Sequence, residues 1–239
     1  MGLFISFEGG EGTGKSTQAE LLAERLQDAG YSVLAVREPG TTRLGTLIRD
    51  LLKRGFVAEE KISSRAELLL FAAARAELVT NVIRPALGQQ ETVVVADRYL
   101  DSTTAYQGYG RGIPLVYVSG INELATDGVV PNLTLLLDCS PEEGLRRVGA
   151  LQLRMPLDGP QAPRSGHHRD EEGTRFEEES LEFHKRVRKG YLKLVEEEPE
   201  RWRVIDATKP IGEINDLIMG HVREKLHSAG HPGKGNLAL

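Results

Sequence analysis

A glycine-rich stretch near the N-terminus has the residue types and spacing of a phosphate-binding loop. Residues 9–16 read Gly-Gly-Glu-Gly-Thr-Gly-Lys-Ser and satisfy the pattern G-x-x-x-x-G-K-[ST] between an apolar run and a stretch of helical period. Backbone N–H groups at a helix N-terminus attract phosphate oxygens, while the lysine reaches the β/γ-phosphates and the serine holds Mg²⁺. The sequence therefore predicts a nucleotide site made by Gly9, Gly10, Glu11, Gly12, Thr13, Gly14, Lys15, Ser16 and Thr17.

A carboxylate interrupts this loop at Glu11. It would repel the phosphates of a bound nucleotide if it pointed inward, so we expect it to point outward, toward a second substrate. The alternative is a solvated loop residue with no role, because charged side chains are mostly exposed.

The apolar run "VVVAD" ends in a second carboxylate that suits the same site. An aspartate at the end of a buried strand beside a phosphate loop helps to position Mg²⁺ and its water shell. Asp97 and Ser16 are therefore the predicted metal residues. The alternative for Asp97 is a simple helix cap.

Short apolar runs alternate with longer stretches of helical period, which is typical of a parallel sheet flanked by helices. We predict an α/β fold with five buried parallel strands, each too apolar to be half-exposed, at 3–8, 32–37, 93–97, 133–138 and 203–206. The predicted helices are 15–29, 42–54, 64–84, 114–127, 141–149, 177–197 and 211–227. Ligands of such folds collect at the carboxyl ends of the strands, where Glu8, Arg37, Asp97 and Asp138 stand.

Composition restricts the remaining possibilities. The 239 residues suit a single domain, taken as 1–227 with a tail at 228–239. A net charge of −5 gives no general electrostatic reason to bind nucleic acid or a membrane surface. Cys139 is the only cysteine, which fits a reducing compartment, and no apolar stretch is long enough to span a membrane, so a cytoplasmic location is expected.

A phosphate loop alone leaves several nucleotide-dependent classes open. Switch GTPases, motors, nucleoside kinases and nucleotide kinases all use one. Guanine-specific GTPases usually carry N-K-x-D, which this chain lacks. Two hypotheses remain, a kinase for a small phosphate acceptor and a nucleotide-dependent switch or binding module without transfer activity.

Five segments together resemble bacterial thymidylate kinases, a family of P-loop nucleoside monophosphate kinases. They read "FEGGEGTGKST", "REPGTT", "LLFAAARAEL", "DRYLDSTTAYQGYGRG" and "RFEEESLEFHKRVRKGYL", and they follow the family's order along nearly the whole chain. The resemblance implies a P-loop NTPase fold with a lid segment, and transfer of the γ-phosphoryl group of ATP to dTMP with Mg²⁺, giving dTDP and ADP for dTTP biosynthesis. It also implies a homodimer.

The resemblance further implies an acceptor site for dTMP. Glu11 would bind the 3′-hydroxyl, and Tyr106 would press on C2′ and exclude a ribose hydroxyl. Phe71 would stack on thymine while Arg75 donates to O4; taken alone, Phe71 is an ordinary core residue and Arg75 a solvated one paired with Glu67 or Glu77. The complete predicted set is Glu11, Arg37, Arg49, Phe71, Arg75, Arg98, Ser102, Thr103, Tyr106 and Gln107, with arginines on the phosphate and Ser102 alternatively a helix cap.

The loop lacks an arginine, so the resemblance implies that a lid at about 146–176 supplies cationic groups. Arg175 is the predicted catalytic member, together with Lys15, Asp97 and Arg98. Prolines and glycines make 156–173 a poor helix, so we interpret it as an insertion. His167 and His168 lie in it and are expected to be solvated and not metal ligands.

Overall fold

A computed structural model describes residues 2–54, 62–89, 91–152, 176 and 179–229. Its strands are β1 (Leu3–Glu8), β2 (Ser32–Arg37), β3 (Thr92–Asp97), β4 (Leu133–Asp138) and β5 (Trp202–Asp206). Its α-helices are α1 (Lys15–Asp28), α2 (Arg43–Arg54), α3 (Ser64–Leu78), α4 (Arg84–Leu87), α5 (Leu100–Thr103), α6 (Leu115–Thr126), α7 (Pro141–Gln152), α8 (Leu181–Glu197) and α9 (Ile211–Ser228). Two π-helical segments, η1 (Val79–Ile83) and η2 (Thr104–Gly110), continue α3 and α5.

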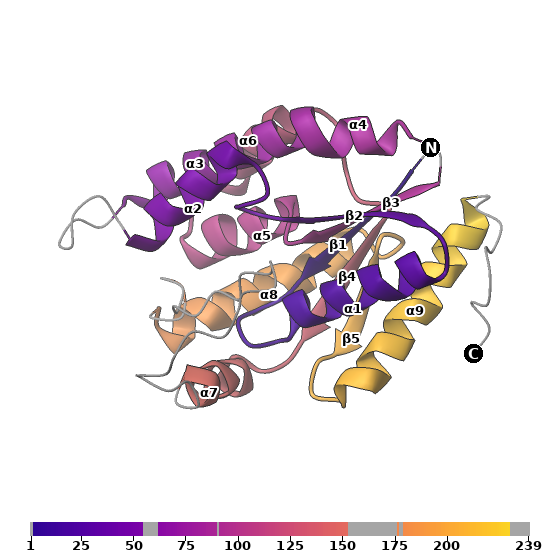
Figure 1. The fold of residues 1–239 in the computed structure, drawn as a ribbon. Coiled ribbons are helices and arrows are strands. Elements are labelled where there is room, and N and C mark those ends of the chain that lie inside the picture. Colours follow the sequence, from indigo (N-terminus) through magenta and orange to yellow (C-terminus); the bar gives the residue numbers. More distant parts are fainter. Residues whose placement is uncertain (1, 55–61, 90, 153–175, 177–178, 230–239) are drawn as a thin grey trace, which may run out of the picture.

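The strands form one parallel sheet in the order β2-β3-β1-β4-β5, so the predicted α/β class and its five strands are confirmed. The central strand β1 carries the phosphate loop at its carboxyl end. Its neighbour β3 ends level with it, because Phe7 pairs with Asp97 in the register. The loop and the strand-end carboxylate therefore lie at the same edge of the sheet (Figure 1).

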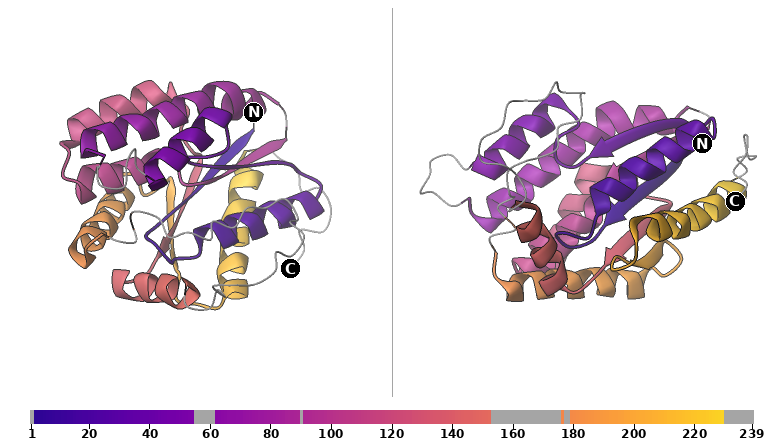
Figure 2. Two further views of the ribbon diagram at one scale, coloured as in Figure 1. Left: turned by 60° about the vertical axis from the view of Figure 1, so that its left-hand side comes forward. Right: turned by 60° about the horizontal axis from the view of Figure 1, so that its bottom comes forward.

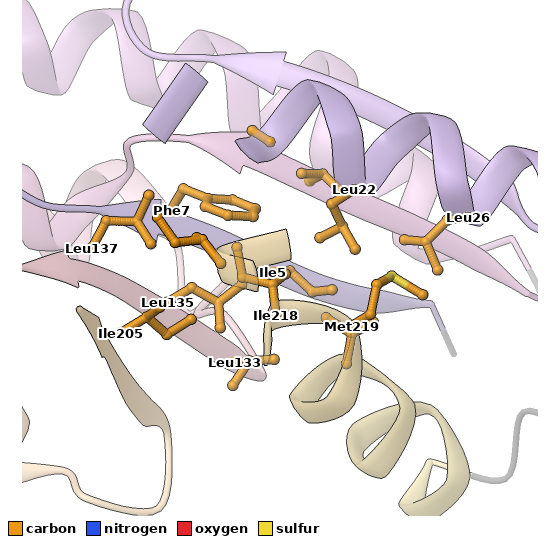
Figure 3. Close-up of a cluster of buried hydrophobic side chains, with 14 of the residues drawn as sticks. Ile5, Phe7, Leu22, Leu26, Leu133, Leu135, Leu137, Ile205, Ile218 and Met219 are labelled. Carbon is orange, nitrogen blue, oxygen red and sulfur yellow. The ribbon is translucent and has the colours of Figure 1, made fainter. Parts of the chain in front are cut away.

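Alternating residues of the central strands make two cores. Ile5 and Phe7 face α1 and α9, where they pack with Leu22 and Ile218 (Figure 3). Phe4, one position away, faces the opposite layer with α3 and η1. This two-residue period follows from the pleat of a strand and leaves β1 buried on both sides.

The edge strands differ from the prediction that no strand is half-exposed. In β2 only Val36 is fully buried, and in β5 the side chain of Val204 is 47% exposed. Both strands lie at the ends of the sheet order, where the flanking helices cover less of each face. The apolar runs therefore predicted these two strands correctly, but the burial expected for them was too high.

The helices match the prediction to within a few residues at their ends, as at α8, which begins at Leu181 where 177 was expected, except in two places. The helix expected over 64–84 changes to π-helix at Val79 before α4 begins. The segment 100–110, to which no helix was assigned, is helical as α5 and η2. Among the described residues, no helix is both long enough and apolar enough to cross a membrane.

Candidate active site

The phosphate loop joins β1 to α1 and depends on glycine for its backbone. Gly9, Gly12 and Gly14 have φ values of 143°, 68° and 85°, a region in which other residues are strained. A Cβ on Gly12 would lie 2.0 Å from the carbonyl oxygen of Gly144 in α7. The right view of Figure 2 shows α7 beside the start of α1. The loop is thus pressed backbone to backbone against α7, which fixes its curve.

The residues that the motif predicts to bind Mg²⁺ and phosphate lie together. Ser16 Oγ donates to Asp97 Oδ2 at 2.6 Å, so this aspartate contacts the loop and is not the cap of α5, whose N-cap is Tyr99. Lys15 is buried, and its Nζ donates to the Gly10 carbonyl oxygen. Burial, with Arg98 nearby, lowers the pKa of Lys15 to about 8. An anionic phosphate in this loop would favour the charged lysine.

A cavity of about 330 Å³ opens beside the loop at the carboxyl edge of the sheet. Its lining comes from the loop, the ends of β2 and β3, and α2, α3, α5 and η2. The predicted site residues that line it are Glu11, Gly12, Gly14, Lys15, Ser16, Thr17, Arg37, Arg49, Phe71, Arg75, Asp97, Arg98, Ser102, Thr103, Tyr106 and Gln107. Arg175, His167 and His168 lie outside the described residues.

Glu11 is turned out of the phosphate loop toward this cavity. Its Oε1 accepts from Tyr106 Oη at 2.6 Å and from Arg98 Nη2 at 3.0 Å. Its side chain is 12% exposed, so the alternative of a solvated loop residue is wrong. Burial works against ionisation, but Arg98 and Lys15 lower the pKa of Glu11 below its ordinary value. The loop therefore presents a carboxylate to the cavity and not to its own phosphate cradle.

Arg98 stands at the centre of the site in an unusual backbone conformation. Its φ of 69° is left-handed, a strain that clusters at functional sites. The guanidinium lies 4.9 Å from the ring centroid of Tyr106 and donates to Ser102 Oγ at 3.2 Å. Ser102 lies within α5 and does not cap it, so that alternative is also wrong. These contacts hold a cation between the phosphate loop and the cavity.

The lining of the cavity includes a buried arginine. Arg75 donates to Glu38 Oε2 at 2.9 Å and 2.7 Å, to Thr103 Oγ1 at 2.8 Å and to Asn122 Oδ1 at 2.8 Å. The alternative of a solvated residue paired with Glu67 or Glu77 is therefore wrong. Glu38, which follows β2, thus holds Arg75 in place.

The two other arginines expected to bind phosphate also line the cavity. The guanidinium of Arg37 lies 3.8 Å from Asp97, and Arg49 donates to the Pro39 carbonyl oxygen at 2.9 Å. Arg37 thus lies beside the carboxylate that also accepts from Ser16. The cavity therefore combines cations that contact the loop, Lys15 and Arg98, with an aromatic side chain, Phe71.

Comparison with known proteins decides the family. A model of the family "Thymidylate kinase" matches residues 7–218. The chain belongs to the thymidylate kinase family. It is 44% identical over 224 residues to the thymidylate kinase of Thermomicrobium roseum, covering 94% of this chain and 96% of that protein. It is 48% identical over 208 residues to that of Desulfovibrio desulfuricans, covering 87% and 89%.

A solved structure extends the comparison to the fold. The crystal structure of thymidylate kinase from Ehrlichia chaffeensis superposes with a TM-score of 0.69 at 31% identity, covering 93% of this chain and 98% of that one. The predicted P-loop NTPase fold is therefore confirmed. Members of the family phosphorylate dTMP to dTDP with ATP.

Sequence reasoning missed several residues of the thymidylate kinase site. The ring of Phe176 lies 6.2 Å from that of Phe71 at an angle of 26°, and 4.9 Å from that of Tyr106. Phe176 follows Arg175 in the family-like segment, which was a usable signal. Gln107, expected near the base, donates to Glu67 at 2.9 Å, and only the fold reveals that pairing.

Proposed function

We propose that the phosphate loop binds ATP and that the cavity binds dTMP with its phosphate toward Arg98. The contacts of the cavity residues support this orientation, because Lys15 and Arg98 donate to loop carbonyl oxygens, while Phe71 supplies an aromatic ring in the lining. An acceptor phosphate at Arg98 would be next to the γ-phosphoryl group held by Lys15. Phosphoryl transfer needs little covalent chemistry from the protein, so positioning and neutralisation of charge are the expected contributions.

Mg²⁺ is proposed as the cofactor because the oxygen donors present suit it. Ser16 and Asp97 offer a hydroxyl and a carboxylate already in contact. No cluster of three or more metal-ligating side chains occurs in the described part of the chain, which agrees with an ion that takes its other ligands from phosphates and water. The ion would offset the negative charge of the phosphates.

Two residues are proposed to select the deoxyribose. Glu11 would accept from the 3′-hydroxyl, and its carboxylate is held toward the cavity by Tyr106 and Arg98. The Tyr106 ring is fixed by that same hydrogen bond and would occupy the space of a 2′-hydroxyl. Exclusion by packing gives limited discrimination, on the order of 1–3 kcal/mol.

The base is proposed to lie between Arg75 and Phe71. Arg75 already uses several of its donors within the protein, which fixes its fork at the end of the cavity. Thymine O4 would accept from it while Phe71 stacks on the ring. Arg175, in a lid at about 146–176, is proposed to join the phosphates, which the sequence pattern alone supports.

The orientation of Glu11 carries the proposal, since an acidic side chain in a phosphate loop needs a second substrate to be useful. We expect Glu11→Ala to lower kcat/KM for dTMP by at least tenfold and to change the KM for ATP much less. Steady-state ADP release, with each nucleotide varied in turn, measures both. A variant with unchanged kcat/KM for dTMP would contradict the assignment.

We also propose a homodimer assembled through α3 and α6. Large apolar side chains are exposed on both helices, including Leu69 (57%), Tyr117 (64%) and Leu124 (83%). Tyr117 and Leu124 are seven residues apart and share one face of α6. Sedimentation velocity should find a dimer, and Tyr117→Glu with Leu124→Glu should yield a folded monomer. A variant that stays dimeric would rule out this surface.

A further inference from the structure

A buried carboxyl group lies directly behind Arg98 and outside the cavity. Glu8, the last residue of β1, is fully buried and does not line the cavity. Its Oε1 accepts from the backbone N–H of Tyr99 at 2.8 Å. Its Oε2 lies 2.5 Å from Ser102 Oγ and 3.0 Å from Tyr191 Oη. Three donors, from the N-cap of α5, from α5 and from α8, therefore converge on one side chain.

The two hydroxyl groups connect this carboxyl group to the guanidinium. Ser102 Oγ and Tyr191 Oη are 2.9 Å apart, and Arg98 Nη1 donates to them at 3.2 Å and 3.5 Å. A hydroxyl that donates to Glu8 keeps its lone pairs for Arg98. Glu8 thus determines which way both hydroxyls face, although it makes no direct hydrogen bond to Arg98.

We propose that Glu8 is a positioning residue that holds Arg98 in its catalytic place through Ser102 and Tyr191. The inference rests on the proposed function, in which Arg98 binds the acceptor phosphate. A guanidinium in a left-handed backbone segment needs such support, because the strained conformation persists only where surrounding contacts determine it. Glu8 provides the acceptor at the back of this small polar network.

Glu8→Gln tests the network without changing its shape. The amide group of glutamine carries two hydrogens that can be donated. A carboxylate carries none, and a carboxylic acid carries one. If the amide nitrogen faces the two hydroxyls, at least one of them must aim its hydrogen at another donor. If the amide oxygen faces them, the NH₂ group meets the backbone N–H of Tyr99 instead. We expect dTMP to bind about tenfold more weakly, equivalent to about 1.4 kcal/mol, with affinity for ADP nearly unchanged.

A double-mutant cycle measured by titration calorimetry separates positioning from a structural effect. If Glu8 acts through Arg98, Glu8→Gln weakens dTMP binding in the native background and has no further effect in Arg98→Ala. Asn215→Ala is the matched control: Asn215 is also buried, but it accepts from Arg25 Nη1 at 2.6 Å and does not line the cavity. Its effect should be the same in both backgrounds.

The possible failures are distinguishable. If the native protein does not bind dTMP, or Arg98→Ala binds it as well as the native protein, the proposed function of Arg98 is wrong. If Arg98→Ala weakens dTMP binding but Glu8→Gln costs the same with and without Arg98, Glu8 is only structural and the inference is overturned. Native affinity in the single Glu8→Gln variant overturns it too.

Discussion

A methyl group added at Gly144 tests how firmly α7 holds the phosphate loop. The Cβ of an alanine there would lie 2.2 Å from the carbonyl oxygen of Glu11, whereas ordinary contact begins at 3.4 Å. Because backbone stands in the way, the loop must move by roughly 1 Å, a displacement that costs on the order of 100-fold in rate. We expect kcat/KM for ATP to fall by about that factor, or about 2.7 kcal/mol of transition-state stabilisation.

Gly149 on the same helix provides the matched control. A Cβ on Gly149 meets nothing within 4 Å, so Gly149→Ala should keep full activity and gain up to about 1 kcal/mol of helix stability. ADP release at saturating dTMP with ATP varied measures kcat/KM, and thermal unfolding shows that both variants fold. If Gly144→Ala keeps kcat/KM for ATP within threefold of the native value, the loop does not depend on this contact.

Three further predictions follow from the site. Tyr106→Ala should lower kcat/KM for dTMP and reduce the preference for dTMP over its ribonucleotide analogue; loss of both activities in proportion would mean that the ring only packs. Arg175→Ala should lower kcat strongly, with a smaller effect on ATP affinity. Deletion of residues 157–171 should lower kcat far less, and an equal loss of kcat would make the insertion part of the catalytic lid. Burial and Asp101 raise the pKa of Glu8 to about 8 from 4.5. The contribution of the protonated Glu8 side chain to the stability of the fold is therefore complete below pH 4.5 and is lost as the pH rises through 8. Relative to Glu8→Gln, the native protein should lose at least about 1.4 kcal/mol of stability between pH 5 and 9, measured by urea unfolding, and a constant difference would contradict that pKa.

The sheet and the loop were predictable because their signals are local. A run such as "VVVAD" has the length and apolarity of a buried parallel strand, and the loop glycines are required by positive φ at Gly9, Gly12 and Gly14. Burial of the edge strands was not predictable, because it depends on the strand order and on which helices cover each face. The helix at 100–110 was missed because its glycines and threonines weaken the helical pattern.

Partners of the buried charges could not be predicted from sequence. From the sequence alone, the expected partner of Arg75 is Glu67 or Glu77 on the same helix. In the structure Arg75 instead donates to Glu38, which follows β2. Such long-range pairs arise where the carboxyl ends of β1, β2 and β3 converge. The role inferred for Glu8 depends on Tyr191 from α8, a contact across 183 positions that no local pattern contains.

Product formation tests the central claim most directly. The purified protein, with ATP, Mg²⁺ and dTMP, should form dTDP and ADP in equal amounts, and omission of dTMP should abolish ADP formation. Separation of the nucleotides by ion-exchange chromatography measures both products in one experiment. Consumption of ATP at the same rate with and without dTMP, and with no dTDP formed, would contradict the assignment of the cavity as the acceptor site.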